Sequence, residues 1–141
     1  MRLSAKKVNC ILTALAVGML LIACDPAAVK LRQFAVQGEQ LYLENCSQCH
    51  QADGEGLALL YPPLADDELL SRPDRIACAI RYGADGPKEI GGKTFNQPMA
   101  AVEKLTDLEV AEILTFLTTS WGRNQQITEA DTVQQLVKNC R

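Results

Sequence analysis

The sequence predicts an all-α domain in which a few helices are joined by long loops. The clearest helix begins at Thr106 and Glu109, whose spacing matches a capping box. Apolar residues then recur every three or four positions, as one face of a helix requires: Val110, Ile113, Leu114, Leu117 and Trp121. Residues 51–66 and 83–99 are rich in glycine and proline and predict long loops. The chain shows no repeat and no βαβ pattern, so a parallel sheet is not expected.

A second helix is predicted over residues 33–45, near the start of the domain. Phe34, Leu41 and Tyr42 fall at helical intervals, and Gly38 lies on the same face. Because a glycine inside a helix costs about 1 kcal/mol relative to alanine, we expect another helix to approach closely at Gly38.

Three smaller elements complete the prediction. Pro73 is suited to the first turn of a helix, which ends near Gly83. The segment EIGGKTFN predicts a small hairpin that turns at Gly91 and Gly92. A last short helix is expected over residues 128–138.

The N-terminus predicts an exported protein. Basic residues precede a short apolar run, residues 10–23, which is typical of a secretory signal peptide. The run ends in LIAC and so resembles the lipobox of bacterial lipoproteins, which implies cleavage before Cys24 and acylation of that cysteine. An uncleaved anchor and ordinary secretion remain as alternatives, although residues 8–24 reach only the lower limit of length for crossing a bilayer.

The expected organisation is therefore a lipoprotein signal peptide (1–23), a lipid-anchored tether (24–32) and one domain with a C-terminal extension (33–141). Asp25 resembles the inner-membrane retention signal of enterobacterial lipoproteins. We therefore expect a periplasmic domain on the inner membrane, with the outer membrane as the open alternative.

The charge balance excludes one class of partner. The whole chain carries a net charge of −3, with 14 basic and 17 acidic residues. Loss of Arg2, Lys6 and Lys7 with the signal peptide leaves 11 basic residues, hence a net charge of −6. A basic nucleic-acid-binding face is not expected, whereas docking on a basic patch of a protein partner is favoured.

Cys46, Cys49 and His50 form a C-x-x-C-H motif that contains the single histidine of the chain. Two thiols at this spacing serve in dithiol redox switches, in zinc sites or in covalent haem attachment. A dithiol switch belongs beside a βαβ pattern, and a structural zinc site needs four ligands, usually from two clusters. Covalent haem c accounts for every position, because two thiols one turn apart bond the porphyrin vinyl groups and His50 lies under the iron. A haem would also supply a core to a small domain with only 5% aromatic residues.

Met99 is the leading candidate for the second axial ligand. Outside the signal peptide the chain has no second histidine and no other methionine, which leaves a lysine or an open, water-filled site as the alternatives. Iron held by His50 and Met99 has no vacant position for a substrate, and methionine raises its reduction potential. This predicts an electron carrier and no enzyme; a haem-based sensor or peroxidase-type enzyme is the alternative if Met99 is not a ligand.

With these motifs, the domain resembles a class I mono-haem cytochrome c. The resemblance implies the cytochrome c fold, thioether bonds at Cys46 and Cys49, and axial ligation by His50 and Met99. It also implies that the Pro62 carbonyl, in preference to that of Pro63, accepts the Nδ1–H of the proximal histidine.

The resemblance also implies contacts and partners. Gly38 and Tyr42 match the first helix of the family, and Phe116 matches the aromatic residue that packs across that glycine. The tail TTSWGRNQQIT is similar to cytochrome domains that partner nitrite reductases, alcohol dehydrogenases and terminal oxidases. The implied donor is a quinol-oxidising complex or dehydrogenase and the acceptor a terminal oxidase or reductase. Both a mobile shuttle and a fixed subunit remain open.

The chain departs from the simplest members of the family in two further cysteines, Cys78 and Cys140. They are either a buried thiol and a tail thiol, or a disulfide that an oxidising compartment permits. Arg81 and Lys93 are candidate partners of the haem propionates.

Overall fold

The structure is a computed structural model and describes residues 25–122 and 124–140. The chain divides into two compact units, residues 1–30 and 31–141. The described residues form six helices and one hairpin, with long loops between them, so the predicted all-α class is confirmed. The helices are α2 (Pro26–Asn45), α3 (Ser47–His50), α4 (Asp67–Leu70), α5 (Pro73–Tyr82), α6 (Asp107–Ser120) and α7 (Ala130–Lys138). The hairpin pairs β1 (Lys88–Ile90) with β2 (Lys93–Phe95) in antiparallel register.

Helix α2 begins seven residues before the predicted start at 33. The Asp25 side chain accepts a hydrogen bond from the Ala27 amide, and Pro26 occupies the first helical position. Both are favourable at a helix start. The segment predicted as a tether is therefore helical from Pro26 onward; its role in tethering stays a prediction.

The remaining predicted elements are found close to their expected bounds. The Thr106–Glu109 capping box is present at α6, and α6 ends before Gly122, whose amide bonds the Leu117 carbonyl. The hairpin turns at Gly91 and Gly92, which both have the positive φ that a tight hairpin turn requires. The one-turn helices α3 and α4 were not predicted.

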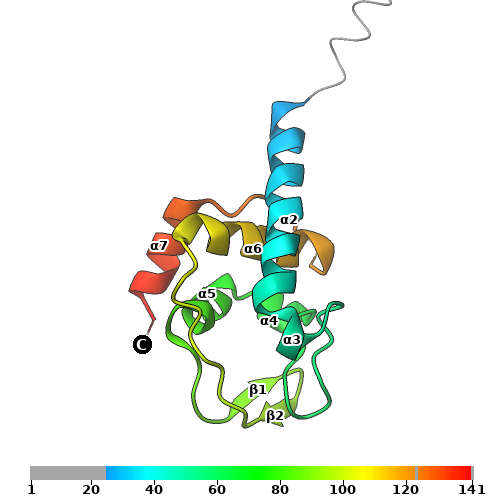
Figure 1. Cartoon of the computed structure of the whole chain (residues 1–141), viewed down its shortest axis with the longest axis vertical. Helices are drawn as coiled ribbons and strands as arrows, with labels where there is room; N and C mark the ends of the chain where they lie inside the picture. Colours follow the sequence, from blue (N-terminus) through cyan, green and yellow to red (C-terminus); the bar gives the residue numbers. More distant parts are fainter. Residues whose placement is uncertain (1–24, 123, 141) are drawn as a thin grey trace, which may run out of the picture. The chain divides into compact units, whose positions relative to one another are not determined.

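Helix α6 is the centre of the core. Helix α7 packs against α5 and α6, and α2 crosses α6 at Gly38 (Figure 1). A Cβ atom on Gly38 would come within 2.8 Å of the Phe116 Cβ and would also clash with the Glu112 carbonyl. The predicted close approach at Gly38 is therefore confirmed, with Phe116 as the residue that packs across it.

The largest fully buried side chains come from α2, β2, α6 and α7. They are Tyr42, Phe95, Val110, Ile113, Leu114, Thr115, Leu117 and Val133. The C-terminal extension is part of this core, because Val133 of α7 is fully buried and the Thr128 amide bonds the Thr115 hydroxyl at 2.9 Å.

Candidate haem-binding site

The C-x-x-C-H motif is one helical turn, made of α3 and of Cys46, the residue that precedes it. The amide of His50 bonds the Cys46 carbonyl at 2.9 Å, and the amide of Cys49 bonds the same carbonyl at 3.1 Å. Cys46 and His50 are buried and Cys49 is half-buried. Neither cysteine of the motif is in a disulfide. Both thiols are therefore free, one at each end of the turn that leads to the histidine.

The His50 ring is oriented by the loop that follows it. Its Nδ1 lies 2.9 Å from the carbonyl oxygen of Pro62. Because a carbonyl only accepts hydrogen bonds, Nδ1 carries the proton and Nε2 carries the lone pair that a metal needs. The acceptor is the carbonyl of Pro62, the residue that was predicted. Its place behind a haem ligand stays a prediction.

The pKa of His50 supports the neutral ring. Burial lowers the pKa of His50 below its ordinary value, and the hydrogen bond to Pro62 acts in the opposite direction with a smaller effect. The neutral imidazole is the form that coordinates a metal.

Backbone hydrogen bonds hold the loop of residues 51–65 in place. The Gly56 amide bonds the His50 carbonyl at 3.0 Å, and the Leu64 amide bonds the Gly54 carbonyl at 2.7 Å. Gly56 has φ +69°, and a Cβ atom there would lie 2.6 Å from the Pro62 carbonyl oxygen. A glycine is therefore required at the point where the Pro62 carbonyl turns toward the histidine.

Three aromatic side chains support this loop from the helices. Tyr42 packs against Phe116 and Trp121, with ring centroids 5.5 and 5.2 Å apart respectively. Its hydroxyl donates a hydrogen bond to the Gln51 carbonyl at 2.5 Å. The Trp121 ring covers Gly54, where a Cβ atom would come within 2.6 Å of the indole. Burial raises the pKa of Tyr42 well above its usual range, so the hydroxyl remains a donor.

Met99 lies at the end of the glycine-rich segment 83–99, where it pairs with Ala84 at the start of that segment. Its amide and carbonyl each pair with Ala84 at 2.9 Å. Gly83, with φ +76°, packs so closely that a Cβ atom would come within 2.6 Å of the Met99 carbonyl oxygen. The half-buried Met99 side chain packs against the core cluster that contains Cys46. Hydrogen bonds thus connect Cys46, Cys49, His50 and Pro62. Met99 packs against the same core cluster as Cys46, and no hydrogen bond joins it to His50 among the described residues.

The rival chemistries fit these residues less well. Within the described part of the chain, no group of three or more His, Cys, Asp or Glu side chains is placed to hold a metal ion. Burial raises the pKa of Cys46 to about 11, whereas a reactive dithiol needs a lowered thiol pKa. Two unpaired cysteines, a neutral imidazole and a thioether instead match the donor set that a covalently attached haem requires.

The other two cysteines form a disulfide, which decides between the two possibilities that the sequence left open. Cys78 of α5 and Cys140, just after α7, are bonded with their Cα atoms 5.5 Å apart. This Cα separation is typical of disulfides. The bridge joins the C-terminal extension to the helix that leads into the Met99 loop.

Arg81, a candidate partner of the haem propionates, is engaged within the chain. Its guanidinium donates to the Leu105 carbonyl at 2.9 Å and to the Asp107 carboxylate at 2.6 Å. Arg81 therefore ties the end of α5 to the start of α6. Lys93 is exposed on β2.

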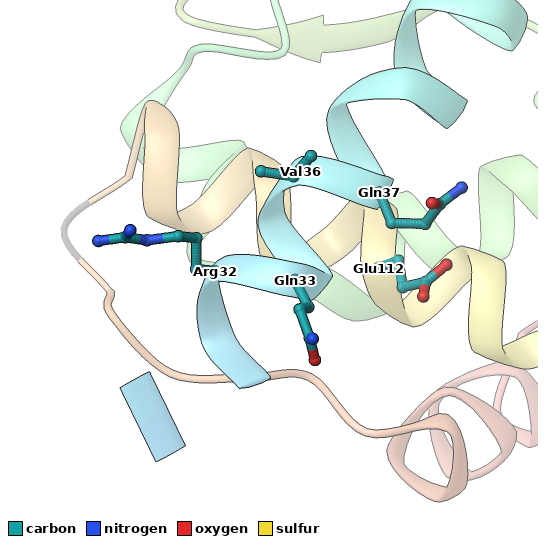
Figure 2. A pocket seen from close by; sticks show the side chains of 5 residues that line it. All are labelled: Arg32, Gln33, Val36, Gln37 and Glu112. Carbon is teal, nitrogen blue, oxygen red and sulfur yellow. The ribbon is translucent and has the colours of Figure 1, made fainter. Parts of the chain in front are cut away.

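A shallow groove of about 450 Å³ lies elsewhere, between α2 and α6. It is lined by Arg32, Gln33, Val36, Gln37 and Glu112. Figure 2 shows the Arg32 and Glu112 side chains on opposite sides of this groove. None of these residues belongs to the predicted site, so the groove is not the haem-binding site.

The comparison with known families decides the class of the protein. A model of the cytochrome c family matches residues 35–121, which is more than half of the chain. The chain belongs to the cytochrome c family. Covalently bound haem c is the cofactor of this family, and the predicted cofactor is therefore confirmed.

The relatives include free cytochromes and subunits of larger enzymes. Cytochrome c-552 of Thermus thermophilus is 30% identical over 95 residues, which are 64% of this chain and 72% of that protein. The fructose dehydrogenase cytochrome subunit of Gluconobacter japonicus is 32% identical over 105 residues. The cytochrome c subunit of alcohol dehydrogenase (quinone) from Gluconobacter oxydans is 29% identical over 102 residues. Each of these two matches covers 70% of this chain but only 21% of the subunit. At the level of the class, the relatives support an electron carrier and not a catalyst.

Several contacts of the site were missed in the sequence analysis. The Gly56 requirement, the Tyr42–Gln51 hydrogen bond and the cover of Gly54 by Trp121 depend on how distant segments meet. The paired glycines of Gly54-Glu55-Gly56 were the one available signal, since two glycines so close to a motif indicate close backbone approach.

The signal peptide (1–23) and the lipidation residue Cys24 lie outside the described residues. Among the described helices, none combines the length and apolar character needed to cross a bilayer.

Proposed function

We propose that this cytochrome is a membrane-tethered one-electron carrier in which His50 and Met99 are the axial ligands of the haem iron. The observation that carries this proposal is the hydrogen bond from His50 Nδ1 to the Pro62 carbonyl. That bond fixes the tautomer and leaves Nε2 as the metal-binding atom. Cys46, one helical turn before the histidine, and Cys49, directly before it, would hold the haem through thioether bonds.

The bound haem supplies an iron centre that takes up and releases one electron. The chain determines how that centre behaves. His50 presents its unprotonated Nε2, because the proton on Nδ1 is donated to the Pro62 carbonyl. Met99 presents a thioether, a ligand that raises the reduction potential. Two strong ligands leave no open position for a substrate. The residues therefore favour electron transfer over ligand sensing or peroxide chemistry.

The proposed partners are redox proteins. Two relatives are named as cytochrome subunits of alcohol and fructose dehydrogenases, which favours a dehydrogenase or a quinol-oxidising complex as the donor. A terminal oxidase or reductase is the proposed acceptor. The net charge of −6 beyond the signal peptide favours docking on a basic surface of the partner.

The proposed location is the periplasmic face of the inner membrane, with an acyl anchor on Cys24. The support is the LIAC sequence that precedes Asp25. The C24S variant tests the anchor. It should lack the mass of the acyl groups that the wild-type protein carries, as mass spectrometry measures. A wild-type protein without acyl groups would contradict the anchor.

Two measurements on the holoprotein test the ligation and the function. A redox titration should give a single one-electron step. NMR of the reduced protein should show the Met99 methyl signal strongly shifted, because a methyl group on the iron lies over the porphyrin ring. An unshifted Met99 methyl would remove Met99 from the iron and favour the sensor or peroxidase-type alternative.

A further inference from the structure

Gln51, the residue directly after His50, has an unusual backbone conformation. Its φ is 63° and its ψ is 162°. This region is open almost only to glycine, so any other residue is strained there. Among the described non-glycine residues only Gln51 and Ala58 have positive φ. Such a conformation persists only where the surrounding structure holds it.

The Tyr42 hydroxyl is the side-chain group that bonds the Gln51 carbonyl, at 2.5 Å. Tyr42 is fully buried in α2, and its ring is packed against Phe116 and edge-on to Trp121. Since this packing holds the ring from two sides, the hydroxyl is a fixed donor. The Gln51 carbonyl is therefore held by a group that belongs to the core.

The direction of the chain at Gln51 also decides where Pro62 lies. The Gly56 amide returns to the His50 carbonyl at 3.0 Å, and the loop then brings the Pro62 carbonyl to Nδ1 at 2.9 Å. If Gln51 relaxed to an ordinary conformation, the loop would leave His50 in another direction. The hydrogen bond to Pro62 would then be weakened or lost.

We infer that Tyr42 is a positioning residue, whose hydroxyl holds Gln51 in a glycine-like conformation and thereby keeps the Pro62 carbonyl at His50 Nδ1. The inference rests on the proposed role of His50 as an axial ligand. A hydrogen bond at Nδ1 makes the imidazole a stronger donor to the metal, which stabilises the oxidised iron. Loss of the Tyr42 hydroxyl therefore weakens that donor and makes the reduction potential more positive.

The test compares Y42F with wild type in the full-length holoprotein, because Y42F keeps the ring and removes only the hydroxyl. Y82F is the matched control, since Tyr82 is 64% exposed at the end of α5. The readouts are the exchange rate of the His50 Nδ1–H by NMR and the reduction potential. Loss of one hydrogen bond, about 1 kcal/mol, predicts roughly fivefold faster exchange in Y42F. It also predicts a positive shift of the potential, with neither change in Y82F.

The Q51G variant tests whether Tyr42 acts through Gln51. Glycine adopts this conformation without strain. The change that Y42F causes in the exchange rate and in the potential should therefore be smaller in the Q51G background than in the wild-type background. An equal effect in both backgrounds would overturn the inference.

A wild-type exchange rate and potential in Y42F would overturn it as well, even if Y42F unfolds more easily. If wild type itself shows no iron-bound His50, the proposed function fails first, and the positioning role fails with it. A normal wild type with an unaffected Y42F would overturn the positioning role alone.

Discussion

The two loops that hold the proposed axial ligands do so in different ways. In the loop of residues 51–65, Pro62 bonds the His50 side chain and Gly56 bonds its carbonyl. In the loop of residues 83–105, Met99 is held through its backbone, which pairs with Ala84. One ligand is therefore oriented by a hydrogen bond to its own ring, and the other by the path of its loop.

This difference follows from the chemistry of the two ligands. An imidazole has a second nitrogen that a carbonyl can hold, whereas a thioether is only a weak acceptor. The Met99 loop is instead closed at its base, where the Val102 amide bonds the Ile80 carbonyl and Arg81 bonds Leu105 and Asp107. We therefore expect His50 to remain bound under conditions that already displace Met99.

The largest expected effect is that of M99A. Removal of the thioether should leave covalent haem and the His50–Pro62 bond in place and open one axial position. The reduced variant should then bind carbon monoxide readily, which an optical spectrum measures. A variant that still refuses carbon monoxide would show that Met99 does not close that position.

The second effect is on stability and comes from the disulfide. Replacement of both cysteines in C78S/C140S removes a bridge between positions 62 residues apart. The chain-entropy relation gives a loss of about 4 kcal/mol for a loop of that size, measurable by denaturant unfolding. Because the bridge holds α5, which leads into the Met99 loop, Met99 displacement should become easier while the His50 Nδ1–H exchange rate stays unchanged. Faster exchange at His50 would break the contrast between the two loops.

A pair of glycine variants compares the loops directly. Gly56 and Gly86 have nearly the same φ, +69° and +72°, but a Cβ atom meets the Pro62 carbonyl at Gly56 and nothing within 4 Å at Gly86. G86A should therefore cost only the backbone strain, about 1–2 kcal/mol. G56A should cost more and also shift the reduction potential. Equal losses of unfolding free energy, with no change of potential, would contradict the role of Gly56 in placing Pro62.

The smallest effect is expected at the start of α6, beyond the Met99 loop. T106A removes the N-cap hydroxyl that bonds Glu109 and should cost about 1 kcal/mol. A hydrogen bond from the Thr106 amide, and to a lesser extent one from the Thr106 hydroxyl, lowers the pKa of Glu109. Because the folded-state pKa is lowered, this contribution is present above the unfolded-state pKa and is lost as pH falls through the folded-state value.

Denaturant unfolding of wild type and T106A, measured across the acidic pH range in which Glu109 becomes protonated, checks the sign of this pH dependence. The difference between the two proteins should shrink as Glu109 becomes protonated. A difference that grows toward acid would contradict the assignment.

Local signals predicted most of the fold and part of the site. The capping box at Thr106, the glycines of the hairpin and the C-x-x-C-H motif each act within a few residues, so the sequence alone reveals them. The predicted start of α2 was seven residues too late, because Asp25-Pro26 was interpreted as part of the tether and not as a helix start.

The support of the proximal loop could not be predicted in the same way. Tyr42 and Trp121 are 79 positions apart, yet both reach residues 51–54 through tertiary packing. The strained conformation of Gln51 also has no signal in its side chain, since glutamine is not a residue that indicates positive φ.

The measurement that tests the central claim most directly is an optical spectrum of the purified wild-type holoprotein, oxidised and reduced, with and without carbon monoxide. Closed axial positions predict a low-spin spectrum in both states and no change when carbon monoxide is added to the reduced protein. A high-spin spectrum, or ready carbon monoxide binding, would contradict ligation by Met99 and with it the assignment as an electron carrier.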